Sequence, residues 1–272
     1  MTSAPEIVRV RAPNPGPLTG AGTNTWIYGQ GETVVIDPGP ADEGHLERVM
    51  ETATRLGRVV MVACTHHHLD HREGAARFCE LAAAPLAVHY RQAVDPSTLP
   101  LHDGDHLLVG GGELVAIHTP GHASDHLCFF EESTRILFTG DHVLQGTTSL
   151  VVPPDGDMAA YLGSLDRVRR LRPSRLLPGH GEPIEAAEAA ISELIAHRLQ
   201  REAQILSQLQ AGPGGPDTLM PRIYASYPPA VLGMAAGTVL AHLIKLEQEG
   251  RVRRLAGDRP DQFELVGESR PT

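Results

Sequence analysis

The sequence predicts an α/β fold followed by a smaller helical module, and three observations lead to that prediction. Short apolar runs rich in β-branched residues alternate with helical patterns up to about Pro183. Four of these runs end in His or Asp beside glycine, as expected where an open α/β sheet gathers ligands at one edge. Beyond Pro183 helical spacing dominates, so the 272 residues fit one large domain, or one with an appendage.

Local patterns justify each element. Strands are predicted from apolar alternation or β-branched runs at residues 7–11, 23–28, 33–37, 58–64, 85–90, 113–119, 127–130, 135–139 and 176–177. Gly29-Gln-Gly31 joins the second and third of these as a hairpin. Helices are predicted from apolar residues three and four apart, over residues 41–56, 73–81, 186–210, 219–227 and 230–249. A last hairpin, 251–254 with 262–266 flanking Gly257–Pro260, completes a tail of winged-helix type.

Composition excludes some functions and compartments. Lys and Arg total 23 against 33 Asp and Glu, a formal net charge of −10, so any surface for nucleic acid must be local. Cys64, Cys79 and Cys128 lie in apolar segments without Cys-x-x-Cys spacing, which indicates reduced thiols and a cytoplasmic protein. Residues 1–17 hold no apolar run of signal length, and no segment reaches the roughly 18 apolar residues of a membrane span.

The stretch Thr65–Gly74 concentrates four imidazoles and a carboxylate just after a predicted strand. His66 and His68 are two residues apart, so near an extended strand end both rings point to the same side. Asp70 and His71 follow as the chain bends into a helix and leave in another direction. Two directions indicate two metal positions, because His and Asp are ligands for borderline divalent metals. The alternative is a chance His-rich turn that binds metal adventitiously.

Three later strand ends supply the remaining candidate ligands: His122, Asp141 and His180. We expect two ligand sets and a bridging carboxylate, namely His66, His68 and His122, then Asp70, His71 and His180, with Asp141 between them. The order His-x-His-x-Asp-His, then a lone His, a lone Asp and a lone His, resembles the metallo-β-lactamase superfamily over about residues 7–184. The resemblance implies a four-layer αββα sandwich with a metal pair, usually zinc, between its two sheets. The expected domains are a catalytic domain (1–184), a linking helix (185–212) and a winged-helix-like domain (213–272).

A narrower resemblance spans nearly the whole chain. The residues that carry it are His197-Arg198, Arg201-Glu202, Gln204–Leu206, Leu246–Gly250, Thr147-Thr148, Tyr161 and Ser164-Leu165. In these residues the chain is similar to the lactamase-beta-like protein two family, which includes a mitochondrial endoribonuclease that cuts single-stranded RNA.

The chemistry expected of such a site is hydrolysis. Two divalent cations about 3.5 to 4 Å apart share a water, lower its pKa and leave a bridging hydroxide between them. Asp141 would offset the repulsion between the cations, and Asp70 would both ligate and act as the catalytic base. Zinc is the expected metal, although these ligands also accept iron or manganese. The sequence identifies no acid for the leaving group; metal-bound water is our hypothesis.

Three functions stay open at this point. The preferred substrate is single-stranded RNA, from the family likeness. The rival is a thioester or lactone, such as a hydroxyacyl-glutathione or an acyl-carrier thioester, which the acidic charge favours because such substrates need no polyanion groove. The third is a nucleic-acid-binding regulator with a relic metal site. The winged-helix tail holds about as many acids as bases, so it is interpreted as a lid or as the surface of a homodimer.

Other polar residues receive weaker interpretations. His67 and His142 flank ligands and are predicted to be structural. His126 either makes a supporting hydrogen bond to the site or is an ordinary core histidine. Asp37 either supports the metal loop or forms a turn before proline. Basic residues that could meet phosphates, but are more typical of solvated faces, are Arg167, Arg169, Arg170, Arg172, Arg175, Arg251, Arg253 and Arg254.

Overall fold

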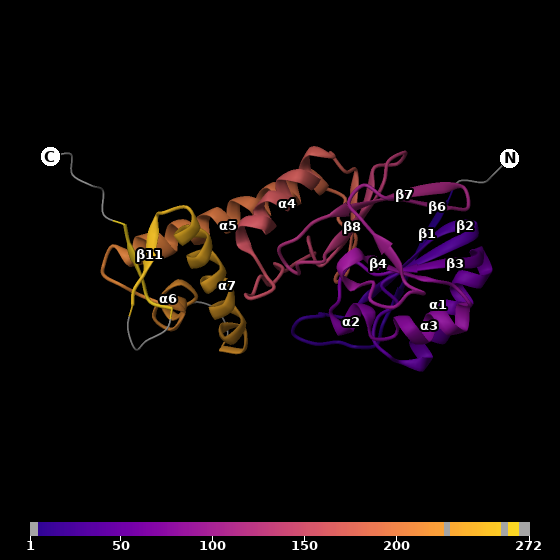
Figure 1. The fold of residues 1–272 in the computed structure, drawn as a ribbon, viewed down its shortest axis with the longest axis horizontal. Helices are drawn as coiled ribbons and strands as arrows, with labels where there is room; N and C mark the ends of the chain where they lie inside the picture. Colours follow the sequence, from indigo (N-terminus) through magenta and orange to yellow (C-terminus); the bar gives the residue numbers. More distant parts are fainter. Residues whose placement is uncertain (1–4, 226–228, 257–260, 267–272) are drawn as a thin grey trace.

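The computed structural model describes residues 5–225, 229–256 and 261–266, with the side chains of 229–234 left undescribed. Two five-stranded sheets and a two-stranded ribbon form its β structure (Figure 1). The first sheet has the order β1 (Glu6–Arg11), β2 (Asn24–Ile36), β3 (Gly57–Ala63), β4 (Leu86–His89) and β5 (Leu99–Leu101). The second has the order β10 (Arg175–Pro178), β9 (Ile136–Gly140), β8 (Leu127–Glu131), β7 (Gly112–His118) and β6 (His106–Val109).

The predicted hairpin lies within β2. Gly29 and Gly31 have positive φ values of 122° and 76°. The Thr25 hydroxyl donates to the carbonyl of Asp37, twelve residues further along, at 2.7 Å. A straight strand would separate those residues by about 40 Å, so β2 folds back on itself and the hairpin prediction is confirmed. Its return half runs parallel to β3.

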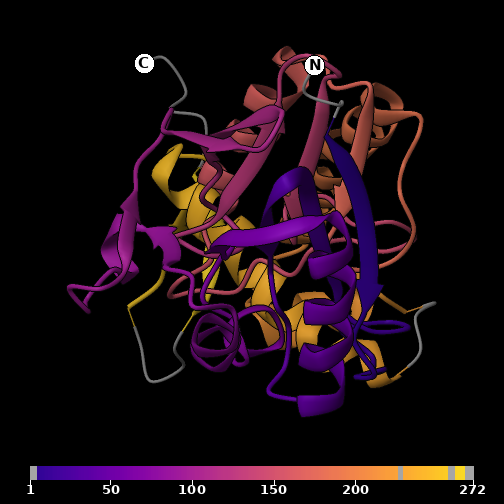
Figure 2. The same cartoon turned by 90° about the vertical axis from the view of Figure 1, so that its right-hand side faces the viewer.

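Helices cover the outer face of each sheet. On the first sheet, α1 (Glu43–Leu56) and α3 (Ala75–Ala82) pack their apolar residues against β2 and β3. On the second, α4 (Met158–Arg170) and α5 (Ala187–Leu209) do the same. Figure 2 looks onto the end of the molecule formed by the first sheet, with the C-terminal segment behind. The layers are therefore helix, sheet, sheet, helix, and the predicted αββα sandwich is confirmed.

Aromatic side chains fill the space between the sheets. The Phe138 ring meets Trp26 and Tyr28 edge-on, with both pairs of ring centroids 6.1 Å apart. These rings and Phe129 are at most 5% exposed. Each such aromatic side chain buries roughly 150–250 Å², so this layer fixes the distance and angle between the two sheets. The loops that carry the candidate metal ligands lie at one edge of the sandwich, where strands of both sheets end.

Two short edge strands were not predicted. β5 is Leu99-Pro-Leu101, and a proline that cannot donate to a ladder is tolerated because β5 closes one edge of the first sheet. β6 closes the edge of the second sheet and exposes alternate residues. Edge strands of three or four residues bury little apolar surface, so their sequences carry a weak signal.

A C-terminal module follows α5. It contains α6 (Pro216–Ile223), α7 (Pro229–Gln248), β11 (Val252–Arg254) and β12 (Phe263–Leu265). Its core includes Ile205 and Leu209 of α5, so this helix belongs to two cores, one at each end. Figure 1 shows α5 running from the sandwich into the module. The predicted loop Gly257–Pro260 and the end of the predicted helix 219–227 lie outside the described residues. The exact domain boundaries at 184 and 212 stay a prediction.

No helix among the residues that the structure describes is both long enough and apolar enough to cross a membrane.

Candidate metal site

Asp37, at the end of β2, supports the loop that follows β3. Its carboxylate accepts hydrogen bonds from the Thr65 backbone N–H at 2.7 Å and the Thr65 hydroxyl at 2.8 Å. It also lies 2.8 Å from His71 Nδ1. Asp37 has a φ of 51°, a left-handed conformation that aspartate tolerates. The structure therefore supports the first interpretation of Asp37, as a support for the His-rich loop, because its carboxylate is bound by Thr65 and His71.

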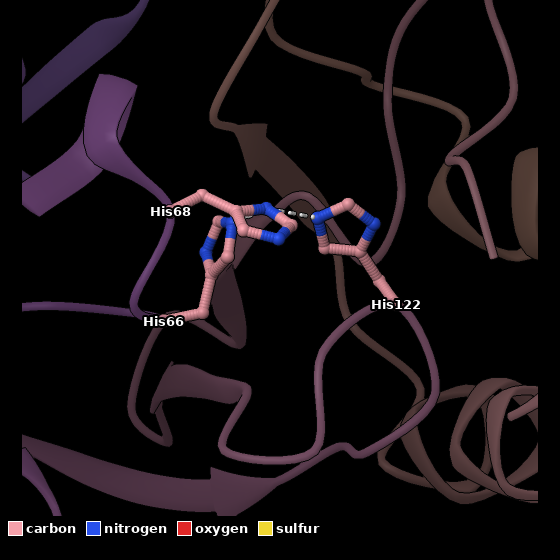
Figure 3. A group of neighbouring side chains, drawn as sticks. All are labelled: His66, His68 and His122. Atoms are coloured by element: carbon pink, nitrogen blue, oxygen red, sulfur yellow. Dashed lines mark hydrogen bonds between the residues drawn. The ribbon is translucent and has the colours of Figure 1, made fainter. Parts of the chain in front are cut away.

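Three histidines form the first group of converging ligand atoms. His66 and His68 come from the loop after β3, and His122 comes from the loop after β7 (Figure 3). His68 Nδ1 lies 2.9 Å from His66 Nε2 and 3.0 Å from His122 Nε2. A zinc ion with ligands at about 2.0–2.1 Å in a tetrahedron separates its nitrogen ligands by about 3.3 Å. The three nitrogens are therefore arranged much as a metal requires.

The second group is formed by Asp70, His71 and His180. His180 Nε2 lies 3.1 Å from Asp70 Oδ2 and 3.3 Å from His71 Nε2. Asp70 and His71 belong to the short helix α2 (Leu69–Arg72), whose direction differs from that of the preceding loop. The loop that carries His180 is tied to the first sheet, because the Asn24 backbone N–H donates to the Gly179 carbonyl at 2.7 Å.

Asp141 lies between the two groups. Its Oδ2 is 3.7 Å from His122 Nε2, and its Oδ1 is 3.2 Å from His71 Nε2 and 3.4 Å from His180 Nε2. Oδ1 is buried and makes no hydrogen bond to any described residue. One carboxylate thus presents one oxygen to each group, which is the placement expected of a bridging ligand. The structure brings all seven predicted residues together.

The outer ring nitrogens of these histidines determine which nitrogens face inward. His66 Nδ1 lies 3.0 Å from the Thr65 hydroxyl, His71 Nδ1 faces Asp37, and His122 Nδ1 lies 2.6 Å from the Leu150 carbonyl. A protonated Nδ1 at each position leaves an Nε2 lone pair pointing inward. Lone pairs 3 Å apart repel unless a cation lies between them, so this donor set fits a divalent metal pair.

Charge is distributed unevenly over the two groups. Burial, helped by neighbouring imidazoles, lowers the pKa of His66 well below its ordinary value and that of His68 to about 4. Burial opposes charge on His180 too, but Asp141 and Asp70 outweigh it and raise its pKa to about 9. Burial likewise opposes charge on Asp141, yet His71 and His180 hold its pKa well below 3.8. The carboxylates therefore make the second group the more attractive to a cation.

Glycines let backbones approach within the site. A Cβ on Gly121, whose φ is 141°, would lie 2.3 Å from the Tyr161 Cα. A Cβ on Gly179 would lie 2.6 Å from His71 Cε1 and 2.7 Å from Asp141 Oδ1. The glycines noted beside the strand-end ligands are thus required by close packing at these two positions.

The three remaining histidines near the site have distinct roles. His126 is buried, and its Nε2 accepts from the Asp141 backbone N–H at 3.2 Å, which confirms the supporting hydrogen bond. His67 pairs with the buried Asp125 at 2.8 Å and points away from the metal groups, as alternation predicts. His142 is fully buried against Tyr161, a structural role. Asp125 was missed, because its partner His67 is close to it only in three dimensions.

A cavity of about 380 Å³ opens over both ligand groups. Sequence reasoning missed its apolar walls, because Leu18 and Val152 belong to irregular segments without periodicity. The described residues that line it are Pro17, Leu18, His68, Asp70, His122, Asp141, Leu144, Thr147, Thr148, Leu150, Val152, Asp155 and His180.

Comparison with known families agrees with this geometry. The sequence profile of the Metallo-beta-lactamase superfamily matches residues 18–180. The chain belongs to this superfamily. A second profile, of the Beta-lactamase associated winged helix domain, matches residues 216–259. These matches confirm the predicted superfamily and the predicted winged-helix module. Membership of the superfamily also confirms the predicted class of enzyme, a hydrolase, for this metallo-β-lactamase protein.

Two fungal relatives carry the same printed name, "Atrochrysone carboxyl ACP thioesterase". The protein from Aspergillus fumigatus is 36% identical over 76% of this chain and 66% of its own length. The protein from Aspergillus chevalieri is 32% identical over 97% of this chain and 85% of its own length. In the first match, the chain spans slightly less than two thirds of its relative.

Two solved structures place the fold and bear on the metal. A metallo-beta-lactamase family protein from Thermus thermophilus has a TM-score of 0.79 and 25% identity over 96% of this chain and 98% of its own. The protein TTHA1623, solved in a di-iron-bound form, has a TM-score of 0.55 and 27% identity over 67% of this chain and 96% of its own. A divalent metal suits this metallo-β-lactamase protein, and zinc in particular stays a prediction.

Proposed function

We propose that this protein is a metal-dependent hydrolase of acyl thioesters, with seven ligands holding two divalent ions. The cavity over the two ligand groups is the observation that carries the proposal. Outside the seven ligands its one charged lining residue is Asp155, and no Lys or Arg is among the described residues that line it. The phosphates on either side of a cleaved phosphodiester would need cations beyond the metal pair, whereas a neutral thioester needs none.

The apolar walls favour an acyl group. Leu144 and Leu150 line the cavity inside, and Leu18 and Val152, which are 54% and 42% exposed, lie where it opens to solvent. Cavities of this kind, mostly apolar with a few converging polar groups, bind small molecules. The volume of about 380 Å³ suits an acyl chain or a small ring system.

Most of the arginines that the sequence offered as phosphate contacts are paired with acids. Four of the five arginines considered near the last metal strand form ion pairs: Arg167 with Asp103, Arg169 and Arg170 with Asp166, and Arg175 with Glu185. The three arginines considered near the C-terminal ribbon do the same, Arg251 with Glu202, Arg253 with Glu264 and Arg254 with Asp261. This pairing neutralises the surfaces that single-stranded RNA would need, so RNA, the preferred substrate from the sequence, loses its support.

The names of the relatives point the same way, since two proteins more than 30% identical to this chain are named as thioesterases of an acyl carrier protein. The comparisons therefore support the thioester alternative over the endoribonuclease. A homodimer through the winged-helix module stays a prediction. A relic site is disfavoured because Asp70, whose retention a structural relic does not require, faces the cavity.

The residues divide the work of hydrolysis as follows. A bound metal pair would supply Lewis acidity for the thioester carbonyl and lower the pKa of water. Burial raises the pKa of Asp70, but the hydrogen bond to His180 and the charges of His71 and His180 together outweigh it and hold the pKa below 3.8, so Asp70 is ionised at neutral pH and free to accept a proton. The apolar walls hold the acyl group and exclude bulk water.

The deciding experiment supplies metal-loaded protein with acyl thioesters of N-acetylcysteamine and of glutathione and, in parallel, with labelled single-stranded RNA. We expect thioester turnover and intact RNA. The Asp70→Ala variant, prepared identically, controls for contaminating nucleases and esterases. RNA cleavage that disappears in this variant, beside inert thioesters, would overturn the proposal.

A further inference from the structure

Helix α5 carries two buried arginines one turn apart, Arg198 and Arg201, which are 2% and 6% exposed. Their contacts are parallel. Arg198 lies over the ring of Tyr161, with its Cζ 5.2 Å from the centroid, and donates to the Ser149 carbonyl. Arg201 lies over the ring of Tyr224 at 4.1 Å and donates to the Ile223 carbonyl at 3.2 Å. The first contacts the metal-bearing sandwich, and the second contacts the winged-helix module.

The contacts of Arg198 continue to the proposed bridging ligand. The Ser149 hydroxyl donates to the Asp141 carbonyl and lies 3.2 Å from the His142 carbonyl. The Tyr161 hydroxyl donates to the same His142 carbonyl at 2.8 Å. Arg198 therefore contacts the Ser149 backbone and the Tyr161 ring, and the hydroxyls of these two residues donate to the carbonyls of Asp141 and His142.

The backbone of Asp141 is held from both sides. Its N–H donates to His126 Nε2, and its carbonyl accepts from Ser149. With both ends of the residue fixed, the carboxylate can present one oxygen to each ligand group. The support at the N–H side comes from within the sandwich, whereas the support at the carbonyl side depends on a residue of α5.

The environment of Arg198 is unusual for a buried cation. Within the described chain no acidic side chain forms an ion pair with it, and its Nε has no hydrogen-bond partner. An unpaired buried charge is costly, and replacing such groups by apolar residues of similar size is often neutral or stabilising. Stability alone therefore does not explain an arginine at this position. The directional hydrogen bond from Arg198 to the Ser149 carbonyl does explain it.

We propose that Arg198 is a positioning residue for Asp141. It thereby sets the affinity of the protein for the second metal ion, which is the ion at the second ligand group. The inference rests on the metal site of the proposed function, but not on the identity of the substrate. It also gives a physical role to the His197-Arg198…Arg201-Glu202 motif. One arginine of the motif aligns the metal bridge, and the other anchors the winged-helix module.

The test compares Arg198→Met with Arg201→Met, a matched variant that removes a guanidinium with parallel contacts three residues away. Metal content is measured by elemental analysis, and the two zinc affinities by competition with a chromophoric chelator, without any substrate. Loss of a residue that supports metal ligands typically costs 10–100-fold in affinity. We expect Arg198→Met to weaken the second zinc by that factor, and Arg201→Met to keep both affinities while lowering the melting temperature.

Two further variants keep the inference falsifiable if Arg198→Met folds poorly. Arg198→Lys retains a donor and should restore part of the affinity, whereas Ser149→Ala should weaken the second zinc as Arg198→Met does. In the double variant of Arg198→Met and Ser149→Ala, the two losses of zinc affinity should not add, because both substitutions act through Asp141. Wild-type affinity for both ions in Arg198→Met and Ser149→Ala would overturn this inference alone. A wild-type protein that binds no metal would overturn it together with the proposed metal site.

Discussion

The edge of the sandwich that carries the candidate ligands and the winged-helix module use buried charge in opposite ways. At the edge, five histidines and two aspartates direct their ligand atoms toward one another, and the carboxylate oxygen Asp141 Oδ1 has no hydrogen-bond partner among the described residues. In the module, Lys245 donates to Glu202 at 2.7 Å and to Glu249 at 2.6 Å, and Arg251 donates to Glu202 at 2.6 Å.

This difference separates function from stability. Imidazole and carboxylate ligand atoms that converge and contact mainly one another are held ready for a cation, which can replace the protons that they share. Lys and Arg side chains that are matched by Glu need no further ion, and they stabilise the contact between α5 and the module. The comparison teaches that in this protein a cluster rich in metal-ligand atoms marks the proposed site, and a cluster of matched cations and anions marks a structural joint.

The largest expected effect comes from metal removal. Treatment with a strong chelator should abolish thioester turnover, and it should lower the melting temperature because ions bound only to the native state stabilise it. Re-addition of zinc, manganese or iron to parallel samples should restore activity, and the most effective metal identifies the cofactor. Undiminished turnover in protein shown to be metal-free by elemental analysis would contradict the proposal. The ligand cluster would then have no function that separates it from the ion-paired cluster of the module.

Asp70→Ala should reduce kcat for the thioester by roughly 10²–10⁴-fold, the usual contribution of a general base. Melting temperature of the metal-free protein should change little, because the Asp70 side chain is 30% exposed. Asp155→Asn is the matched control, since Asp155 lines the same cavity but lies outside the ligand groups. Equal activities of the two variants would show that Asp70 is not the base.

Asp37→Asn should weaken metal binding by about 10–100-fold, because the amide replaces a carboxylate that orients His71 and Thr65. Zinc competition measures the loss. Asp42→Asn serves as control, since Asp42 only caps α1 and asparagine caps equally well. A wild-type affinity in Asp37→Asn would mean that the loop keeps its shape without this carboxylate.

The smallest effect on activity should come from Lys245→Met. The free energy of unfolding should fall by about 1–3 kcal/mol, since Glu202 loses one of its two partners, while kcat stays at the wild-type value. Thermal unfolding and turnover of the same sample measure both. A loss of kcat beyond the loss of folded protein would contradict the assignment of this cluster to stability.

The pH dependence of stability sharpens the same comparison. Burial lowers the pKa of Lys245, but Glu202 and Glu249 outweigh it and raise the pKa above 10.5, so this contribution is present below pH 10.5 and lost above the raised value. The hydrogen bond from Lys245 lowers the pKa of Glu249 below 4.5, so this contribution is lost as the pH falls through the lowered value. The difference in stability between wild type and Lys245→Met should therefore be constant between about pH 5 and 10.

Particular residues show how far sequence reasoning reached. His66, His68, Asp70, His71, His122, Asp141 and His180 were selected because each follows a predicted strand, and the structure brings all seven together. The hairpin at Gly29-Gln-Gly31, the long helix α5 and the winged-helix elements follow from strong local patterns. The edge strands β5 and β6 escaped because three or four residues at a sheet edge carry little periodic signal.

The sequence alone determined the candidate ligand set, the superfamily and the class of chemistry, because strand ends and residue order are local properties of the chain. Only the tertiary structure decided what surrounds that set: the acidic and apolar cavity, the neutralised arginines and the reach of Arg198 to Ser149. Such features depend on side chains that are distant in sequence and adjacent in space, and no periodicity along the chain records that adjacency.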